Sequence, residues 1–285
     1  MTRLISVVIP CYNAEHSVLK SIRSLQKQSY PHWEAIVVND GSTDGTRDVI
    51  LGIDEARIQY YEFKENRGRG AARQKGLEMA TGEFLAMVDA DDWIYDNKLE
   101  DQVRILEDNP NLSLISGGMA ITDGKDQIIG MRIGDNVIRT WTDIGFPPIP
   151  HGPSMIRMSV AKPFSYDVTM KHSQDIEFLS KCMLGKEYMV SSKIWYVYSE
   201  HVSVTKYKIL VSYLYSLKYI SRYVWKRPMS AIKHIILLLL KICYLGVVSI
   251  FKSTEQILKR RSTEPTTEIV SEFEKQRSNL DNYLL

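Results

Sequence analysis

The sequence predicts an α/β fold in which helices flank a mostly parallel β-sheet. Apolar segments rich in Val and Ile alternate with segments of helical spacing through the first hundred residues. The apolar segments are continuous rather than alternating, which is typical of strands buried on both faces. A chain of 285 residues, 44% of them hydrophobic, is also long enough to bury one large core and carry an appendage.

Strands and helices alternate in the predicted N-terminal region. The predicted strands are 4–9, 33–38, 58–62 and 83–88. The predicted helices are 15–28, 71–80 and 99–106. Ligands in such folds bind beyond the carboxyl ends of the strands, so residues 10–13, 39–45 and 89–92 are predicted to share one rim.

The second half of the chain has weaker periodicity. Clustered Gly and Pro residues predict loops and hairpins between 112 and 164. A helix is predicted from Gln174 to a stop at Gly185. The polar stretch from Ser262 predicts a mobile or loosely docked tail.

Charge and cysteine usage exclude several classes of protein. The 36 Lys and Arg nearly balance the 34 Asp and Glu, so no net field indicates nucleic-acid binding. Three widely spaced cysteines, Cys11, Cys182 and Cys243, support neither a disulfide framework nor a structural zinc site. The short apolar start has no cleavage site, which indicates that the catalytic part stays in the cytosol.

Three carboxylates, Asp89, Asp91 and Asp92, directly follow the fourth predicted strand. Burying this much unpaired negative charge would be costly. A hard cation such as Mg²⁺ or Mn²⁺, bridging to a phosphate, would neutralise it. A solvated turn that caps the next helix is the alternative for an isolated Asp-x-Asp. The position at a strand end, beside two other strand-end motifs, favours the metal and phosphate.

The turn at 39–45 follows another predicted strand and contains Asp40. A carboxylate at a strand end can accept a hydrogen bond from an N–H of a nucleobase. Tyr12, two residues after Pro10 on the neighbouring strand, could stack on the base. A turn without a ligand is the alternative.

Two glycines and several arginines open the predicted helix after residue 66. Helix N-termini and arginines both favour phosphate. Arg73 occupies the third glycine position of a dinucleotide-binding motif, which argues against an NAD-dependent enzyme.

These motifs, in this order, resemble the family-two glycosyltransferases, which have the GT-A fold and transfer a sugar from a nucleotide-sugar donor. The resemblance covers roughly the first 205 residues and rests on 7–13, 37–45 and 89–92. It implies a nucleobase pocket, usually for uracil, lined by Pro10, Tyr12 and Asp40.

The same resemblance implies roles for the remaining rim residues. Arg73 is expected near the diphosphate, and Asp89, Asp91 and Asp92 are expected to hold the ribose and the metal. Asp91 or Asp92 would be the direct metal ligand.

Asp175 resembles the base of the family, which is the Asp of a Glu-Asp pair at the start of a later helix; Gln174 departs from the usual Glu. A carboxylate at a helix N-terminus is kept ionised by the dipole and can accept a proton from an acceptor hydroxyl. A helix-terminal charge without catalysis is the alternative.

Two histidines are further candidates. His201 lies in a stretch that resembles the end of the family domain and is a candidate for contact with the metal or the diphosphate; a structural histidine is the alternative. In that stretch Ser199 stands where Arg is more usual. His151 and Gly152, in the Pro-rich loop, are candidates for the acceptor site.

The segment 206–251 interleaves Tyr and Trp with Lys and Arg, and residues 201–254 carry no acidic side chain. Its apolar run 235–251 has 17 residues and contains Lys241, whereas a membrane span needs about 20 apolar residues. Amphipathic helices lying on the membrane surface are therefore predicted, peripheral to the cytoplasmic face of the inner (plasma) membrane. Packing on the catalytic domain or on a second copy is the alternative.

The predicted organisation is a GT-A domain at 1–205, a basic aromatic helical extension that associates with the membrane at 206–261, and a polar tail at 262–285. The predicted function is an inverting glycosyltransferase that uses Mn²⁺ or Mg²⁺. It would transfer a sugar from a nucleotide sugar, a UDP-sugar in particular, to a glycan or lipid-linked acceptor in cell-surface polysaccharide synthesis. No nucleic-acid partner is expected.

Two alternatives stay open. A non-catalytic, membrane-associated partner of a glycan-assembly complex could retain the nucleotide pocket, with Gln174 and Ser199 as signs of decay. A nucleotidyltransferase would be expected to carry a Gly-rich basic loop after the first strand, where this chain has Pro-Cys-Tyr-Asn at 10–13.

Overall fold

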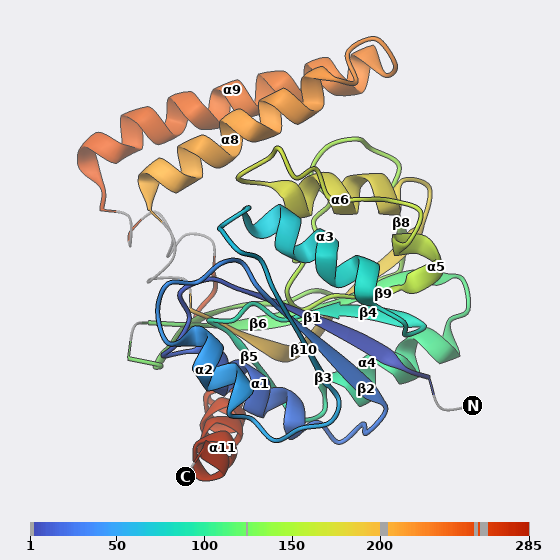
Figure 1. Ribbon diagram of the computed structural model, residues 1–285. Coiled ribbons are helices and arrows are strands. Elements are labelled where there is room, and N and C mark those ends of the chain that lie inside the picture. Colours follow the sequence, from blue (N-terminus) through green and yellow to red (C-terminus); the bar gives the residue numbers. More distant parts are fainter. Residues whose placement is uncertain (1–2, 124, 200–204, 254–255, 257–261, 285) are drawn as a thin grey trace.

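A mixed sheet runs through the centre of the molecule in the order β3-β2-β1-β4-β9-β6-β10-β5, with β7 beside β6 and β8 beside β10 (Figure 1). This computed structural model describes residues 3–123, 125–199, 205–253, 256 and 262–284. The strands are β1 (Ile5–Cys11), β2 (Trp33–Asn39), β3 (Ile58–Glu62), β4 (Phe84–Met87), β5 (Trp93–Ile94), β6 (Leu112–Thr122), β7 (Ile128–Arg132), β8 (Arg139–Thr140), β9 (Met155–Arg157) and β10 (Glu187–Ser199).

The longer strand pairings are parallel, which confirms the predicted sheet. Strand β1 lies parallel to β2 and β4, β2 lies parallel to β3, and β6 lies parallel to β10. The short strand β9 runs antiparallel between β4 and β6. The strands predicted from continuous apolar segments are all present, with bounds that differ by at most two residues.

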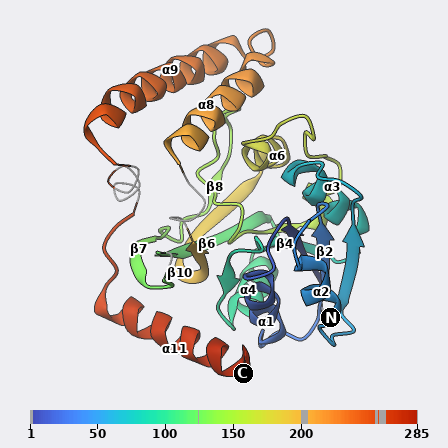
Figure 2. The same cartoon turned by 60° about the vertical axis from the view of Figure 1, so that its left-hand side comes forward.

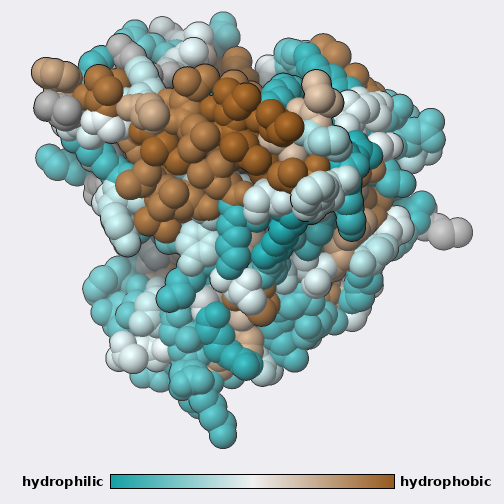
Figure 3. Space-filling model, turned by 90° about the horizontal axis from the view of Figure 1, so that it is seen from above, coloured by the Kyte–Doolittle hydropathy of each residue, from teal (hydrophilic) through white to brown (hydrophobic). Residues whose placement is uncertain are grey.

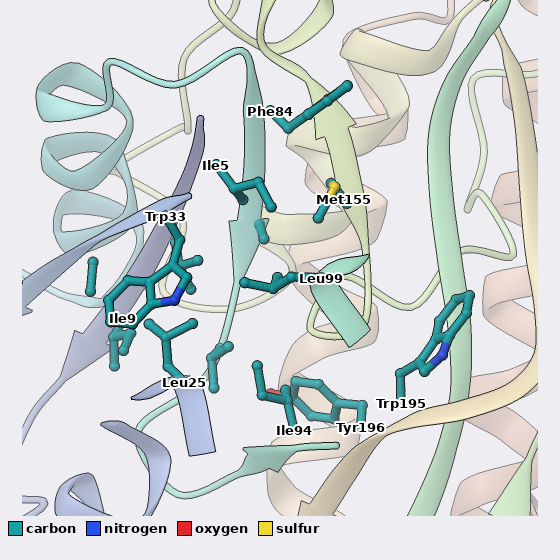
Figure 4. Close-up of a cluster of buried hydrophobic side chains, with 14 of the residues drawn as sticks. Ile5, Ile9, Leu25, Trp33, Phe84, Ile94, Leu99, Met155, Trp195 and Tyr196 are labelled. Atoms are coloured by element: carbon teal, nitrogen blue, oxygen red, sulfur yellow. The ribbon is translucent and has the colours of Figure 1, made fainter. Parts of the chain in front are cut away.

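Helices cover both faces of the sheet (Figure 1). One face carries α1 (Val18–Gln26), α2 (Thr46–Leu51) and α4 (Lys98–Asp108), and the other carries α3 (Arg69–Met79), α5 (Met158–Ala161) and α6 (Gln174–Met183). In β1, Val7 and Ile9 pack in the cluster that contains Leu25 of α1, whereas Val8 packs in the cluster that contains Phe178 of α6. Figure 4 shows Ile9 and Leu25 side by side with Trp33. Burial on both faces explains why the apolar pattern is continuous.

The prediction of loops and hairpins between 112 and 164 was wrong for its first part. Strand β6 is buried along its whole length, and only its pairing with β7 is a hairpin. Gly117, which contributed to the loop prediction, lies in the middle of β6, where a Cβ atom would overlap the ring of Trp195. The glycine therefore allows close packing inside a strand rather than a turn.

The prediction of a mobile or loosely docked tail was also wrong. Helix α11 (Thr267–Leu284) packs beside α1 at the end of the molecule opposite α8 and α9 (Figure 2). Phe273 and Leu280 are buried, with the Phe273 ring 5.8 Å from that of Trp93. Gln276 Nε2 donates to Asp96 Oδ1 over 2.9 Å. Three inward positions at helical spacing are enough to dock a helix whose sequence is otherwise polar.

Helices α8 (Lys206–Ser221) and α9 (Pro228–Phe251) form a hairpin above α3 and α6 (Figures 1 and 2). Asp143, in the loop before β9, fixes α9 to the domain by accepting hydrogen bonds from Ser230, Lys233 and His234. Packing on the domain, the alternative to membrane attachment, is thus observed for one side of the hairpin. The division of the chain at residues 205 and 261 stays a prediction.

Candidate functional site

The loops after β1 and β2 meet at one rim of the sheet, as the sequence predicts. The amide of Asp40 donates to the carbonyl of Cys11 over 2.8 Å. The amide of Thr43 donates to Asn13 Oδ1 over 2.9 Å, and the amide of Asn13 donates to the hydroxyl of Ser42 over 2.9 Å. These bonds lock the two predicted nucleotide-binding motifs against each other.

The residues predicted to hold a nucleobase differ in exposure. Tyr12 is 48% exposed, so its ring is available to stack on a ligand, whereas Asp40 is 3% exposed. The carboxylate of Asp40 accepts hydrogen bonds from the amides of Arg67 and Gly68, over 2.8 and 2.9 Å. Burial raises the pKa of Asp40, although both bonds oppose the shift. Pro10 is buried in β1, in register with Val38 of β2, and the role of all three in base binding stays a prediction.

Arg73 and Asp89 form an ion pair at the centre of this rim. Arg73 Nη2 lies 2.9 Å from Asp89 Oδ1, and the two side chains are 4% and 22% exposed. Burial would raise the pKa of Asp89, but Arg73 and Arg69 outweigh it and lower the pKa to about 2. Burial would likewise lower the pKa of Arg73, but Asp89, and after it Asp175, raise it above its usual value. Both groups are therefore charged at neutral pH.

The carboxylate of Asp92 is hydrogen-bonded within the protein through both of its oxygens. It is 2% exposed, and its two carboxylate oxygens accept from the hydroxyl of Tyr196 at 2.7 Å and from the amide of Ser199 at 3.0 Å. Burial, Asp91 and Asp89 raise its pKa well above the usual value. The hydroxyl of Tyr196 also accepts from the amide of Asp89 over 3.1 Å, so this tyrosine ties both ends of the acidic loop to β10.

Asp91 is the exposed member of the acidic loop. Desolvation and then repulsion from Asp89 raise its pKa, while Arg69 opposes the shift. Within the described part of the chain, no three His, Cys, Asp or Glu side chains are grouped to hold a metal ion. Magnesium and manganese sites at substrate phosphates need only one or two carboxylates, so the hard oxygens of Asp91 fit such an ion. His201 lies outside the described residues.

Asp175 reaches the same site from the other side. It is the second residue of α6 and is half-buried. A Cβ atom at Gly70, in the first turn of α3, would lie 3.6 Å from Cγ of Gln174, so the start of α6 packs against the start of the helix that carries Arg73. The charges of Asp175 and Asp89 both raise the pKa of Arg73. The fold thus brings Asp175, the predicted base, next to the Arg73–Asp89 pair.

His151 is buried behind the Arg73–Asp89 pair. Its Nε2 lies 2.9 Å from the hydroxyl of Tyr166, whose ring stacks on Phe178 at 4.0 Å. Burial and then Arg73 lower the pKa of His151 to about 4, so the ring is neutral at pH 7. Its Nδ1 has no hydrogen-bond partner among the described atoms.

The sequence did not point to Tyr166 or Tyr196, which hold His151 and Asp92. Each lies in an ordinary apolar or mixed stretch, and no local motif marks it. The structure shows that Gly152 leaves room for Tyr196, because a Cβ atom there would lie 2.8 Å from the hydroxyl of Tyr196.

Residues 6–162 match Glycosyl transferase family 2. The chain belongs to this family. The family membership and the rim motifs disfavour a nucleotidyltransferase.

Two curated glycosyltransferases are similar in sequence to this chain, which is compared with each in turn. It is 38% identical over 135 residues to the Escherichia coli UDP-Glc:alpha-D-GlcNAc-diphosphoundecaprenol beta-1,3-glucosyltransferase WfgD, covering 47% of this chain and 53% of the relative. It is 44% identical over 106 residues to the putative teichuronic acid biosynthesis glycosyltransferase TuaG of Bacillus subtilis, covering 36% of this chain and 42% of the relative. The chain thus matches about half of each relative.

Solved structures of low identity confirm the GT-A fold. TarS 1-349 of S. aureus in complex with UDP aligns with a TM-score of 0.60 at 21% identity, over 76% of this chain and 65% of that one. The mannosyltransferase PcManGT of Pyrobaculum calidifontis, in complex with GDP-Man and Mn²⁺, aligns with a TM-score of 0.62 at 15% identity, over 100% of this chain and 85% of that one.

Proposed function

We propose that this chain is a metal-dependent, inverting glycosyltransferase that moves a sugar from a UDP-sugar to a lipid-linked glycan acceptor at the cytosolic membrane surface. The observation that carries the proposal is the position of Asp175 at the start of α6, which packs against the start of α3 next to the Arg73–Asp89 pair. A single displacement requires a base on one side of the donor sugar and a site for the leaving diphosphate on the other.

The reaction follows from these positions. Asp175 accepts the proton of the acceptor hydroxyl, and the oxygen attacks the anomeric carbon of the donor. The new carbon–oxygen bond forms as the bond to the diphosphate breaks, and UDP leaves with that electron pair. One displacement inverts the anomeric configuration.

Asp91 is assigned as the metal ligand in preference to Asp92. Both oxygens of Asp92 already accept hydrogen bonds from β10, whereas Asp91 is exposed on the rim. A bound Mn²⁺ or Mg²⁺ would supply positive charge for the departing diphosphate.

The donor and acceptor classes come from the relatives. The E. coli relative is named for a UDP-glucose donor and a diphosphoundecaprenol-linked acceptor. A UDP complex is known for the similar TarS fold. A lipid-linked acceptor also fits the hairpin, which presents an apolar surface above the site.

The apolar surface of α9 favours membrane attachment. Figure 3, which views the molecule from above, shows apolar side chains gathered on the outer face of the hairpin. On α9, exposed apolar side chains repeat at helical spacing and include Met229, Ile232, Ile236, Leu239, Leu240, Tyr244, Val247 and Phe251. No acidic residue occurs between 201 and 254, so the charged side chains of α8 and α9 are all basic and would attract anionic lipid.

Helix α9 is proposed to lie in the plane of the membrane surface. The segment Pro228–Ser249 is long and apolar enough to cross a membrane, and 22% of its most apolar window is buried in the protein. Ala231, His234 and Leu238 are buried on its inner side, and His234 Nε2 lies 2.8 Å from Asp143 Oδ2. Crossing the membrane would break these contacts, whereas in-plane attachment keeps them.

UDP is expected to stabilise the protein only when Mn²⁺ is present. At a UDP concentration of about 100 times Kd the stabilisation is about 2.7 kcal/mol, which corresponds to a rise in Tm of roughly 5–10 °C. Asp91→Asn should abolish the metal-dependent rise, and Asp108→Asn at the exposed end of α4 should keep it. Differential scanning fluorimetry measures both. A shift in Asp91→Asn equal to that of the unaltered protein would remove Asp91 from the metal site.

Introducing charge on the outer side of α9 is expected to release the protein from membranes. Leu240 and Val247 are each 60% exposed, so Leu240→Glu/Val247→Glu adds two charges without disturbing the core. The fraction that floats with vesicles containing phosphatidylglycerol should fall at least about tenfold. Leu51→Glu, at a residue 55% exposed on α2, is the matched control and should float normally. Equal flotation of both variants would contradict attachment through α9.

A further inference from the structure

Ser173, the residue before α6, has an unusual backbone and an unusual partner. Its φ is 59°, in the left-handed region that few residues other than glycine, Asn and Asp adopt. It occupies the N-cap position, where a serine hydroxyl normally accepts a hydrogen bond from its own helix, and it makes no such bond. A strained residue two positions before Asp175 indicates that neighbouring contacts hold the start of α6 in a defined conformation.

The hydroxyl of Ser173 is held by α8. It lies 2.7 Å from the hydroxyl of Ser212 and 3.1 Å from the carbonyl of Ser212, and Ser216 donates to it over 3.3 Å. Ser173 and Ser216 are 8% and 2% exposed, so water does not compete freely for these bonds. We call these three residues the serine cluster.

The flanking contacts fasten the same face of α8 to the segment that leads into α6. The rings of His172 and Tyr215 lie 5.8 Å apart. Arg222 Nη1 lies 2.7 Å from Asp167 Oδ2. Because Ser212, Tyr215 and Arg222 recur at helical spacing, one face of α8 sets the approach of the chain into α6.

We propose that Ser212 and Ser216 of α8 are positioning residues, which hold Ser173 in its left-handed conformation and thereby place Asp175 for catalysis. The proposal rests on the function proposed above, because it assigns the base role to Asp175. In this proposal the outer face of the hairpin contacts the membrane, and its inner face, on α8, positions the base.

Loss of the serine cluster should affect turnover rather than donor binding. The predicted nucleotide-binding motifs lie on the loops after β1, β2 and β4, whereas the hydroxyls of Ser212 and Ser216 bond Ser173 at the start of α6. A displacement of about 1 Å in a reacting group can lower the rate about 100-fold. The variant Ser212→Ala/Ser216→Ala should therefore lower kcat about 10- to 100-fold and leave the KM for the donor unchanged.

Hydrogen exchange tests the cluster without any knowledge of the acceptor. In the full-length protein, amides of residues 173–177 should exchange about tenfold faster in Ser212→Ala/Ser216→Ala, while those of α3 stay unchanged. Ser221→Ala is the control, because that hydroxyl donates to the carbonyl of Lys218 in its own helix and, among the described residues, makes no bond to α6. Unchanged exchange at 173–177, or equally faster exchange in α3, would overturn the proposal.

Kinetics separate positioning from a merely structural role. The readout is UDP release from UDP-glucose or UDP-GlcNAc, with UDP-induced stabilisation measured in parallel. Ser212→Thr/Ser216→Ala, which restores one hydroxyl, should recover a large part of kcat. Faster exchange at 173–177 with kcat equal to that of the unaltered protein would overturn the proposal. Turnover that persists in Asp175→Asn would instead refute the function proposed for Asp175.

Discussion

Replacing Asp175 with Asn is expected to lower kcat for sugar transfer by about 10²- to 10⁴-fold, the range typical for loss of a general base. The amide keeps the size of the side chain but cannot take the proton of the acceptor hydroxyl. Asp175 is half-buried at the start of α6, whereas the residues predicted to hold UDP follow β1, β2 and β4, so the UDP-induced rise in Tm should stay unchanged. Release of UDP from UDP-glucose or UDP-GlcNAc in the presence of a polyprenyl-diphosphate acceptor measures the rate.

Glu177→Gln is the matched control for this prediction. Glu177 also lies in the first turn of α6, but its Oε1 pairs with Lys181 Nζ at 2.8 Å. It should retain turnover within a few-fold of the unaltered protein. If Asp175→Asn turned over as fast as Glu177→Gln, the base would have to be another group. If UDP bound but no variant, including the unaltered protein, released or transferred sugar, the non-catalytic alternative would be favoured.

Features that depend on local sequence could be predicted. Buried parallel strands produce continuous runs of Val and Ile, so β1 to β4 were found, and their ends located the nucleotide rim. The acidic loop and the start of α6 were also found, because each combines a short motif with a strand end or a helix start.

Features that depend on distant packing could not be predicted. Gly117 predicts a turn unless Trp195, 78 positions later, is known to occupy the space of its side chain. The hydrogen bond between Tyr196 and Asp92 joins residues 104 positions apart, so no local pattern shows that the carboxylate of Asp92 is hydrogen-bonded within the fold. The docking of α11 depends on few buried side chains, and a polar composition conceals them.

Replacing Arg73 with Met is expected to destabilise the protein by about 3–5 kcal/mol, because it leaves Asp89 charged and largely buried without its partner. The pair is 2.9 Å apart and only 4% and 22% exposed. Urea unfolding at pH 7 measures the change. Arg139→Met is the control, since its partner Asp135 and Arg139 itself are both exposed, and its midpoint should stay unchanged.

A double substitution distinguishes an unpaired charge from lost packing. If Asp89 is destabilising only because its charge lacks a partner, Arg73→Met/Asp89→Asn should recover most of the stability lost in Arg73→Met. The recovered protein should still fail to transfer sugar, because Asp89 belongs to the acidic loop and Arg73 is its ion-pair partner at the predicted diphosphate site. A double variant no more stable than Arg73→Met would mean that the guanidinium stabilises the fold by filling space. A stable double variant that also transfers sugar would show that the pair serves folding alone.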